Sequence, residues 1–448
     1  MQRSPTTLGT ENIKKLLFEY SIPAIISMIA TSLYNIIDSI FIGHGVGALA
    51  ISGLAIAFPL MNLAAAFGAL IGVGGATLVS IKLGQQDHEE ASNILGNVVV
   101  LNVVIGILFM LLGLIFIDEI LFFFGASHDT IDYTRDFMQI ILYGNVITHL
   151  YFGLNNIMRS SGYPRKAMIT TLLAVLVNVI LAPIFIFGFK WGIRGAAIAT
   201  VIAQLIALLW TIEHFTPKHS FIHFQTGIFR LQKRIVTGIF SIGMAPFILN
   251  ACACVVVILI NRSLYKYGGD LAIGAYGIVN RLTMLVIMII MGFTQGMQPI
   301  VGYNFGAQQY KRVLSVMRLT MIYVLCVTSL GFFVGQLFPH QMAMLFTNDE
   351  TLIDLAVDGM RIVMCVFPIV GFQMVISHFF QSIGKASKAI FISATRQLLF
   401  LIPLLLILPA YWGTMGVWVS MPVSDVASAI TAGIFFYFEF KMFKKISI

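Results

Sequence analysis

Long apolar runs recur from one end of this chain to the other, and they limit what it can fold into. Examples are Leu172–Phe187, Cys252–Ile260 and Leu398–Leu408. Stretches of about 20 mostly apolar residues are typical of helices that cross a hydrocarbon core about 30 Å thick. Closed β-barrels also span membranes, but their strands alternate polar and apolar residues, which these runs do not do. The runs therefore predict an all-α polytopic membrane protein.

The composition agrees with this prediction. Asp, Glu, Lys and Arg make up 10% of the 448 residues, whereas soluble domains average about 25%. So few charges cannot cover the surface of a water-soluble protein of this length. Twelve transmembrane helices are predicted, near residues 15–42, 53–81, 93–117, 132–158, 166–189, 195–215, 235–261, 271–303, 313–337, 353–382, 388–410 and 416–440.

The net charge of +8 is distributed very unevenly among the connections. Lys190, Arg194, Arg262 and Lys266 are the Lys and Arg residues of one set of connections, and the other set carries many more. The richer set is Arg3, Lys14, Lys15, Lys82, Arg159, Arg165, Lys166, Lys218, Arg230, Lys233, Arg234, Lys311, Arg312, Arg318, Lys385, Lys388, Lys441, Lys444 and Lys445. Cytoplasmic loops are enriched in Lys and Arg, so both termini are expected in the cytoplasm. The basic excess is thereby explained without nucleic acid as a partner.

The two halves of the chain resemble each other. A shift of 222 residues places Gly74 on Gly296, Gly84 on Gly306 and Lys166 on Lys388. One residue later in register, Gly192 falls on Gly413. We therefore expect two pseudo-symmetric six-helix bundles, residues 1–222 and 223–448, in the same membrane orientation. Such parallel repeats are typical of transporters that work by alternating access.

Ionisable residues at membrane depth are costly and therefore mark candidate sites. Asp38 lies in the outer half of the first predicted helix, and no Lys or Arg of the first half lies at similar depth. This pattern is typical of a carboxyl that couples transport to a cation, although a protonated acid in a packing hydrogen bond is the alternative. Polar residues that could share this site are Tyr34, Asn35, Asn178, Thr200 and Gln204. For each of these alone, an ordinary interhelical hydrogen bond is the competing interpretation.

The second half offers a different set of candidates. Asp425 and Arg281 lie at similar depths, so an ion pair between them is the default expectation, with Asp425 as a cation-binding wall of a cavity as the alternative. Arg396 is a third ionisable residue of this half. An adaptable cavity wall for apolar ligands is a second hypothesis, carried by Met284, Met288, Met291 and Gln295. In the first helix, Pro23 permits a bend below Asp38.

Several segments resemble the multidrug and toxic compound extrusion (MATE) transporters. They are Leu33–Gly43, the Gly68–Gly75 stretch, Leu83–Asp87, Asn178–Pro183, Gly192–Thr200 and Gln298–Ala307. The last of these is similar to the DinF-like branch, and the resemblance covers essentially the whole chain. It implies an exporter of cationic or amphipathic compounds in a bacterial cell inner membrane, driven by inward H⁺ or Na⁺. It also implies that Asp38 is the coupling acid and that Asn178 and Thr200 belong to its site.

The chain departs from the family pattern at Ala182, where many members have Asp. One carboxylate in place of two weakens a sodium site, so H⁺ is the expected coupling ion and Na⁺ the alternative. No catalytic motif is found, and no enzyme activity, metal or cofactor is expected. The expected partners are lipophilic small molecules and membrane lipids, and the protein is expected to be a monomer. Two alternatives remain: a flippase for lipid-linked precursors, which would need a basic cavity, and a non-transporting membrane scaffold or receptor.

Overall fold

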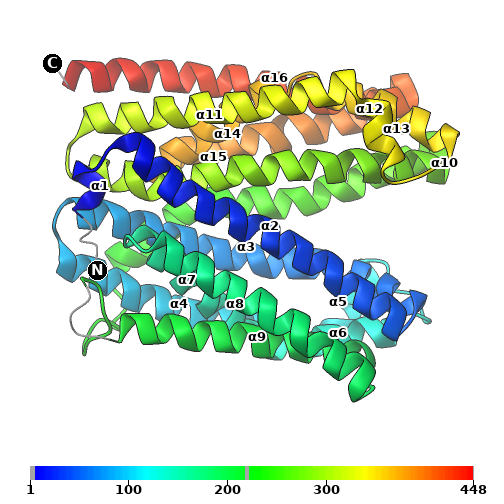
Figure 1. The fold of residues 1–448 in the computed structure, drawn as a ribbon, viewed down its shortest axis with the longest axis horizontal. Coiled ribbons are helices and arrows are strands. Elements are labelled where there is room, and N and C mark those ends of the chain that lie inside the picture. Colours follow the sequence, from blue (N-terminus) through cyan, green and yellow to red (C-terminus); the bar gives the residue numbers. More distant parts are fainter. Residues whose placement is uncertain (1–5, 217–220, 447–448) are drawn as a thin grey trace. The chain divides into compact units, whose positions relative to one another are not determined.

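The computed structural model describes residues 6–216 and 221–446 of the chain, and none of these residues forms a strand (Figure 1). The helices of the first half are α1 (Thr7–Thr10), α2 (Ile13–Gly45), α3 (Ala48–Gly84), α4 (His88–Ile115), α5 (Ile117–Phe123), α6 (Ile131–Tyr143), α7 (Asn145–Ser160), α8 (Pro164–Pro183), the π-helix η1 (Ile184–Gly188) and α9 (Gly192–Phe215). Those that follow are α10 (Lys233–Gly306), α11 (Tyr310–Leu337), α12 (Pro339–Met344), α13 (Glu350–Met364), α14 (Phe367–Ser382), α15 (Ala386–Ala394), the π-helix η2 (Thr395–Leu401) and α16 (Ile402–Ile446). Of the basic residues that predict the orientation, Arg3 and Lys218 lie outside the described ranges.

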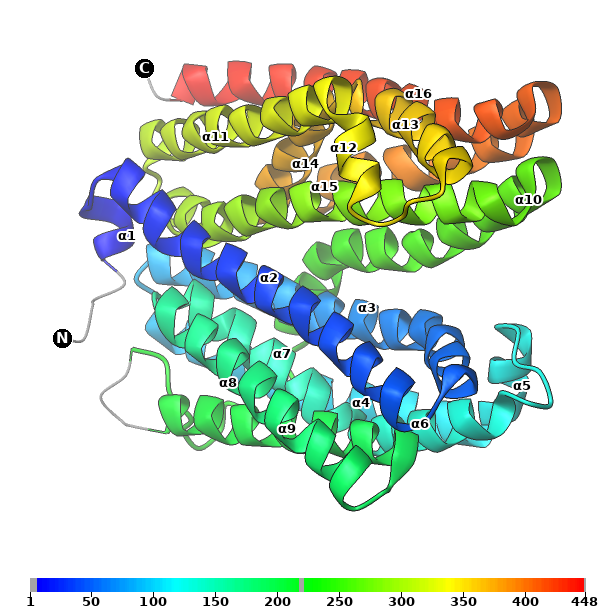
Figure 2. The same ribbon diagram turned by 45° about the vertical axis from the view of Figure 1, so that its right-hand side comes forward.

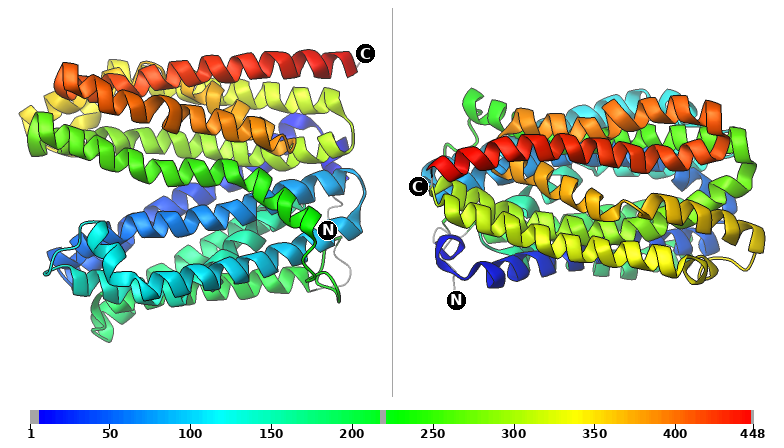
Figure 3. Two further views of the ribbon diagram at one scale, coloured as in Figure 1. Left: turned by 180° about the vertical axis from the view of Figure 1, so that it is seen from behind. Right: turned by 90° about the horizontal axis from the view of Figure 1, so that it is seen from above.

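Two of these helices contain more than one membrane span. In α10, Gly269 has the positive φ of 67° and separates a first stretch, Lys233–Gly269, from a second, Leu271–Gly306. In α16, Gly413 has a φ of 57°, and the two stretches of this helix run alongside each other in Figure 3. A continuous helix over the 57 residues Ala386–Met442 would be about 85 Å long at 1.5 Å per residue, far more than a bilayer core requires. This segment therefore holds two spans.

The described residues contain nine helices that are long and apolar enough to span a membrane, or eleven if each bent helix pair is one span. The bent pairs are α6 with α7, at 54°, and α13 with α14, at 50°. Dividing Ala386–Met442 at Gly413 brings the total to the predicted twelve. The prediction of an all-α polytopic membrane protein is confirmed.

The backbone repeats its special conformations at the spacing found in the sequence. Positive φ angles occur at Gly47 and Gly269, at Gln86 and Gln308, and at Gly162 and Gly384, each pair 222 residues apart. Residues other than glycine rarely adopt a positive φ. Gln86 and Gln308 both do so, so the same strained turn occurs in both halves. The repeat is therefore a property of the local fold as well as of the residue types.

The chain forms two compact units, whose boundaries differ from the ends of the repeats. Unit 1 comprises the described parts of Met1–Thr10 and Ile26–Asn250, and unit 2 comprises Glu11–Ile25 with the described part of Ala251–Ile448. In unit 1, α3, α4, α7, α8 and α9 run lengthwise beside one another (Figure 1). In unit 2, α11, α14 and the second stretch of α16 do the same (Figure 2). The domains predicted at 1–222 and 223–448 divide the chain by its sequence repeat, whereas these units divide it by contacts. The predicted domain boundaries therefore stay a prediction.

Each unit is completed by part of a helix from the other half of the sequence. The beginning of α2 packs in unit 2, where Phe18 contacts Tyr323 with ring centroids 4.9 Å apart. The beginning of α10 packs in unit 1, where Phe247 contacts Phe67 with centroids 5.0 Å apart. Both helices therefore leave one unit and enter the other partway along their length, α2 after Ile25 and α10 after Asn250.

Candidate functional site

Three helices of unit 1 meet at the hydroxyl of Thr200. The Asn178 Nδ2 of α8 donates to Thr200 Oγ1 over 3.0 Å, and the Tyr34 hydroxyl of α2 lies 3.0 Å from the same oxygen. Thr200 itself donates to the carbonyl of Ala196, one turn earlier in α9, over 3.1 Å. The hydroxyl therefore acts as the shared acceptor of this cluster. Since each polar group in a hydrocarbon environment needs a partner, these two contacts favour one relative rotation of the three helices.

Asp38 lies one helical turn beyond Tyr34 on α2 and is only 6% exposed. Its Oδ1 is buried and has no hydrogen-bond partner among the described residues. An ionised carboxylate held this way would lose the hydration of that oxygen without gaining a hydrogen bond to it. Binding a proton, or accepting bonds from a cation or water, removes that cost. The geometry therefore suits a carboxyl that alternates between two states.

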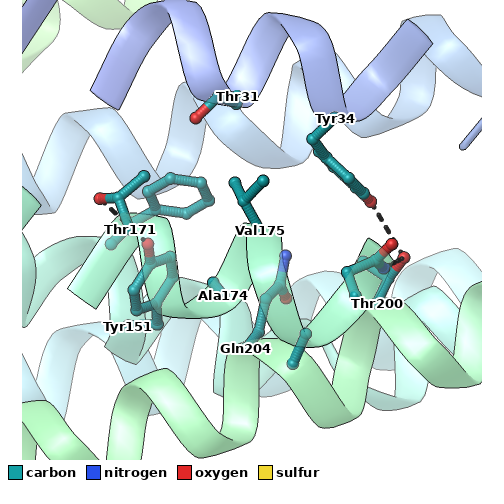
Figure 4. Close-up of a pocket in the computed structure, with 11 residues that line it drawn as sticks. Thr31, Tyr34, Tyr151, Thr171, Ala174, Val175, Thr200 and Gln204 are labelled. Atoms are coloured by element: carbon teal, nitrogen blue, oxygen red, sulfur yellow. Dashed lines mark hydrogen bonds between the residues drawn. The ribbon is translucent and has the colours of Figure 1, made fainter. Parts of the chain in front are cut away.

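A pocket opens directly beside this cluster (Figure 4). It encloses about 460 Å³ of space, counting the part open to the outside. Tyr34 points from α2 toward Thr200 in Figure 4, whereas the Thr31 hydroxyl donates to the carbonyl of Ser27 in its own helix. The full lining is Thr31, Tyr34, Tyr151, Phe152, Thr171, Ala174, Val175, Asn178, Thr200, Ala203 and Gln204.

The space in the pocket follows from the residues that line it. Ala174 of α8 and Ala203 of α9 contribute short side chains, so these two packed helices leave room between them. At the end away from Thr200, the Tyr151 hydroxyl donates to Thr171 Oγ1 over 3.3 Å. Gln204 lies between the two ends in Figure 4, and its side-chain oxygen accepts from Thr148. The pocket thus combines apolar side chains with hydrogen-bonding groups, which suits an amphipathic ligand.

Position 182, where the resemblance would lead one to expect a second acid, lies in an apolar environment. Ala182 is fully buried and belongs to a hydrophobic core of unit 1 that includes Ile42, Ile186 and Ala197. Directly after it, Pro183 is followed by the π-helix η1. The site of unit 1 consequently contains Asp38 without an acid at position 182.

The structure brings together most, but not all, of the candidates of the first half. Tyr34, Asn178 and Thr200 share the hydrogen-bonded cluster, and Gln204 lines the pocket. The side chain of Asn35 is exposed and does not line the pocket. Pro23 is buried within α2 in the part that belongs to unit 2, two residues before the boundary at Ile25.

The methionine candidates lie on the second stretch of α10, which belongs to unit 2. Met284 is 45% exposed, whereas Met288, Met291 and Gln295 are half-buried. Arg281 begins this face and is exposed. These side chains are separate from the unit 1 pocket, whose lining comes entirely from residues of that unit.

Asp425 forms an ion pair within the second half, as expected, but the expectation that its partner is Arg281 is wrong. The Asp425 Oδ1 instead accepts a hydrogen bond from the Nε of Arg396 over 2.7 Å. Arg396 lies in η2, and a π-helix changes the direction in which the following side chains point. Counting residues inward from the helix ends identified side chains at the same level of the membrane. It could not identify which helix faces α16.

The positions of unit 2 that correspond to the unit 1 cluster are apolar. The 222-residue shift places Tyr34 on Val256 and Asp38 on Ile260, and the register one residue shorter places Thr200 on Met421. These three residues pack together in a hydrophobic core of unit 2. The same shorter register places Gln204 on Asp425, so the Asp425–Arg396 pair occupies the counterpart of a pocket position. The polar cluster is thus confined to one of the two repeats.

Sequence reasoning missed three polar residues of the pocket, Thr31, Tyr151 and Thr171, as well as its apolar lining. A signal for one of them was present, because Tyr151 begins a row of polar residues spaced by four, with Asn155 and Arg159. Residues spaced by four lie on one face of a helix. Thr31 and Thr171 carry no comparable signal, since a hydroxyl in an apolar helix most often bonds its own backbone.

The chain is similar to known transport proteins over nearly its whole length. A family model described as MatE matches residues 23–184 and 244–407. The multidrug export protein MepA of Staphylococcus haemolyticus (strain JCSC1435) is 29% identical over 425 residues, which cover 94% of this chain and 92% of that protein. MepA of Staphylococcus aureus (strain NCTC 8325 / PS 47) is also 29% identical, over 427 residues covering 94% of this chain and 93% of that protein.

Solved structures give the same result. The MATE multidrug transporter DinF-BH, solved in a complex, is 36% identical, with a TM-score of 0.90 and coverage of 98% of both chains. A MATE protein in the bent conformation is 23% identical, with a TM-score of 0.93 and coverage of 100% of both chains. At this lower identity the likeness shows the fold alone.

Proposed function

The chain belongs to the MatE family and is a multidrug efflux transporter, and from this premise we propose that it exports lipophilic organic cations in exchange for inward-moving H⁺. Asp38 is the coupling acid. The observation that carries the proposal is the burial of Asp38 with one carboxylate oxygen lacking a hydrogen-bond partner in the described chain. A buried carboxylate without a partner is costly, so a change in its protonation or in its partners during each cycle is favoured.

Proton coupling is favoured over sodium coupling by the number of carboxylates. A hard cation such as Na⁺ needs several oxygen ligands, usually including carboxylates. In unit 1 the position where a second acid was expected is Ala182, which lies within an apolar core. In unit 2 the counterparts of Tyr34 and Asp38 are Val256 and Ile260, which are also apolar. One carboxyl with a nearby tyrosine, amide and hydroxyl is sufficient for a proton.

The substrate class is inferred from the pocket and from the relatives. The pocket beside the Tyr34–Thr200 cluster combines the rings of Tyr34, Tyr151 and Phe152 with polar groups at both ends. The faces of aromatic rings attract organic cations, most strongly where water is excluded. The relatives are described as a multidrug export protein and a multidrug transporter. A lipophilic cation is therefore the class of substrate that we assign to this chain.

The proposed cycle uses the helix whose two ends belong to different units. Asp38 takes a proton from outside and becomes neutral, which favours repacking of α2. Pro23 lies close to the place where α2 leaves unit 2, and its ring removes one backbone hydrogen bond and permits a bend there. The repacking expels substrate, the units change orientation by alternating access, and the proton leaves inward.

The cellular setting is proposed on the same basis. The MepA relatives are bacterial multidrug export proteins, and the loop charges predict that both termini are cytoplasmic. We therefore place the chain in the cell inner membrane as a multi-pass monomer in contact with lipids. A lipid-linked precursor flippase is less favoured, because one of its two candidate basic residues, Arg396, is already engaged by Asp425.

The first experiment tests Asp38 directly. Purified protein is reconstituted in proteoliposomes, and efflux of a fluorescent lipophilic cation is followed under an imposed pH gradient without Na⁺. Asp38→Asn is expected to reduce gradient-driven export by at least about 100-fold while leaving dye binding measurable. Asp129→Asn is the matched control, because Asp129 is exposed in the loop before α6 and should behave as the native protein.

Two results would contradict the proposal. Full proton-driven export by Asp38→Asn would remove Asp38 from the mechanism. Export by the native protein that requires a Na⁺ gradient, with no response to pH, would reassign the coupling ion.

A further inference from the structure

A row of three polar side chains follows one face of α7. Tyr151, Asn155 and Arg159 are spaced by four residues and therefore lie above one another. Tyr151 and Asn155 are each only 4% exposed, and Arg159 is half-buried. Polar and charged groups inside a membrane bundle are costly and usually line a pathway or a site.

The row is connected by hydrogen bonds within α7 and to α8. The Tyr151 hydroxyl donates to Thr171 Oγ1 over 3.3 Å, and Asn155 Nδ2 donates to the carbonyl of Ala167 over 2.9 Å. Arg159 Nη2 donates to Asn155 Oδ1 over 3.4 Å. We name Tyr151, Thr171, Asn155 and Arg159 the polar track.

The track begins at the pocket and ends near one end of unit 1. Tyr151 and Thr171 line the pocket, which also contains Tyr34, the residue one turn from Asp38. Arg159 lies at the last turn of α7, at the end that the loop charges predict to be cytoplasmic. Eight residues of helix separate the two ends of the row, about 12 Å at 1.5 Å per residue. The pocket has polar partners for water at both of its ends.

We propose that the coupling proton leaves unit 1 along the polar track, and that Arg159 keeps metal cations out of it. This inference rests on the proposed function, since it gives a route for the proton released by Asp38. Each water along the route accepts one proton and passes one on, so that Asp38 ends as a carboxylate and one proton reaches the cytoplasm. No residue of the track changes its own charge.

Arg159 gives the track its selectivity. A guanidinium stays protonated under all conditions of interest, and its positive charge at the cytoplasmic end of the track would repel Na⁺ and K⁺, as fixed charges do in channels. A proton moving through hydrogen-bonded water does not have to pass the guanidinium as an ion with its hydration shell.

The test replaces Arg159 and a matched arginine. Arg159→Leu removes the charge at the end of the track, and Arg165→Leu removes an exposed charge at the start of the neighbouring helix. Uptake of ²²Na⁺ into proteoliposomes is measured without a pH gradient. Arg159→Leu is expected to raise the uptake about tenfold or more, with the native protein and Arg165→Leu unchanged. Equal uptake by all three proteins would overturn the role of Arg159.

A second measurement tests the route without depending on transport or on the stability of the Arg159 variant. Cys252, Cys254, Cys326 and Cys365 are replaced by Ser, and Thr171→Cys is added. A small water-soluble thiol reagent applied from the cytoplasmic side is expected to label position 171, and Asn155→Leu is expected to slow this labelling about tenfold. Absence of labelling, or no effect of Asn155→Leu, would overturn the track even if proton-driven export by the native protein is confirmed.

Discussion

At the scale of single residues, Thr200 decides how the candidate site is built. Its hydroxyl is the one atom that the side chains of Asn178 and Tyr34 both reach, and its own proton is directed to the carbonyl of Ala196. The residue is nearly buried, at 6% exposure. The cluster therefore depends on a hydroxyl at this position and not merely on a residue of similar size.

Thr200→Val keeps the shape of the side chain and removes the acceptor. Asn178 then loses its partner in a buried position, which costs about 1–3 kcal/mol. We expect a lower thermal midpoint in detergent and weaker binding of a lipophilic cation dye. Thr211→Val is the control, because Thr211 is buried on the same helix and donates to the carbonyl of Ala207 in its own backbone. Similar losses in both variants would show that the cluster has no special role.

At the scale of elements, corresponding helices of the two repeats begin with the same backbone but different caps. Asp87 precedes α4 with φ −91° and ψ 75°, and its carboxylate accepts from the Glu90 N–H over 3.1 Å. Its counterpart 222 residues later, Gln309, precedes α11 with φ −85° and ψ 62°, and the side chain makes no capping bond within the described chain. The repeat thus preserved the turn and changed the interaction that stabilises the helix end.

Removing the cap of α4 should lower the stability of the protein, and introducing a cap at α11 should raise it. Asp87→Ala removes a capped N–H and should lower stability by about 0.5–2 kcal/mol, whereas Asp87→Asn keeps an acceptor and should change it little. Gln309→Asp should raise stability by about 1 kcal/mol. Thermal unfolding in detergent at neutral pH measures all three. A stability loss in Gln309→Asp would show that the neighbours of α11 prevent capping.

The contribution of Asp87 should also depend on pH. Burial acts to raise the pKa of Asp87, but the backbone bond from Glu90 and the Lys82 ammonium, 3.2 Å away, hold it below the usual range. A carboxyl whose pKa is lowered by folding stabilises the protein above its unfolded value of about 3.9. That stability is lost as the pH falls through the lower folded value. The difference between native protein and Asp87→Ala should therefore shrink in acid.

At the scale of the whole molecule, each unit contains part of a helix from the other half of the sequence. Glycines let the beginnings of α2 and α10 approach the helices of the other half closely. A Cβ on Gly243 of α10 would lie 1.7 Å from the Leu70 carbonyl oxygen of α3, both in unit 1, and a Cβ on Gly296 would lie 2.3 Å from Ser21 Oγ, both in unit 2. The shift of 222 relates Ser21 to Gly243 and Gly74 to Gly296. A Cβ on Gly74 would lie 3.2 Å from the Gly243 nitrogen, so each repeat makes the corresponding contact.

Gly243→Ala tests whether this contact holds the beginning of α10 in unit 1. Alanine normally stabilises a helix by about 0.5–1 kcal/mol relative to glycine. At Gly243 the added methyl would collide with backbone, and we expect a clear loss of stability. Gly277→Ala in the same helix meets nothing within 4 Å and should be neutral or stabilising. A stabilised Gly243→Ala would show that the helix is not closely packed there.

Much of the site could be read from the sequence because its residues are unusual at their positions. Asp38 is an acid in an apolar helix, and Asn178 and Thr200 belong to segments that resemble the MATE family. Tyr34 was among the polar candidates and lies one turn from Asp38 on the same helix, whereas Asn35, chosen beside it, is exposed and does not line the pocket. Thr31 and Thr171 could not be found this way, since a hydroxyl in such a helix gives no sign of the direction in which it points.

The sequence by itself determined the helical class, the spans and the repeat. In a hydrocarbon core every backbone polar group needs an internal partner, so long apolar runs leave few options, and a 222-residue register requires no knowledge of contacts. The tertiary structure alone decided that Asp425 pairs with Arg396 instead of Arg281, and that the beginnings of α2 and α10 pack in different units from their ends. Hydrophobicity is a property of each residue, whereas the partner of a side chain depends on how neighbouring helices are rotated and where they cross.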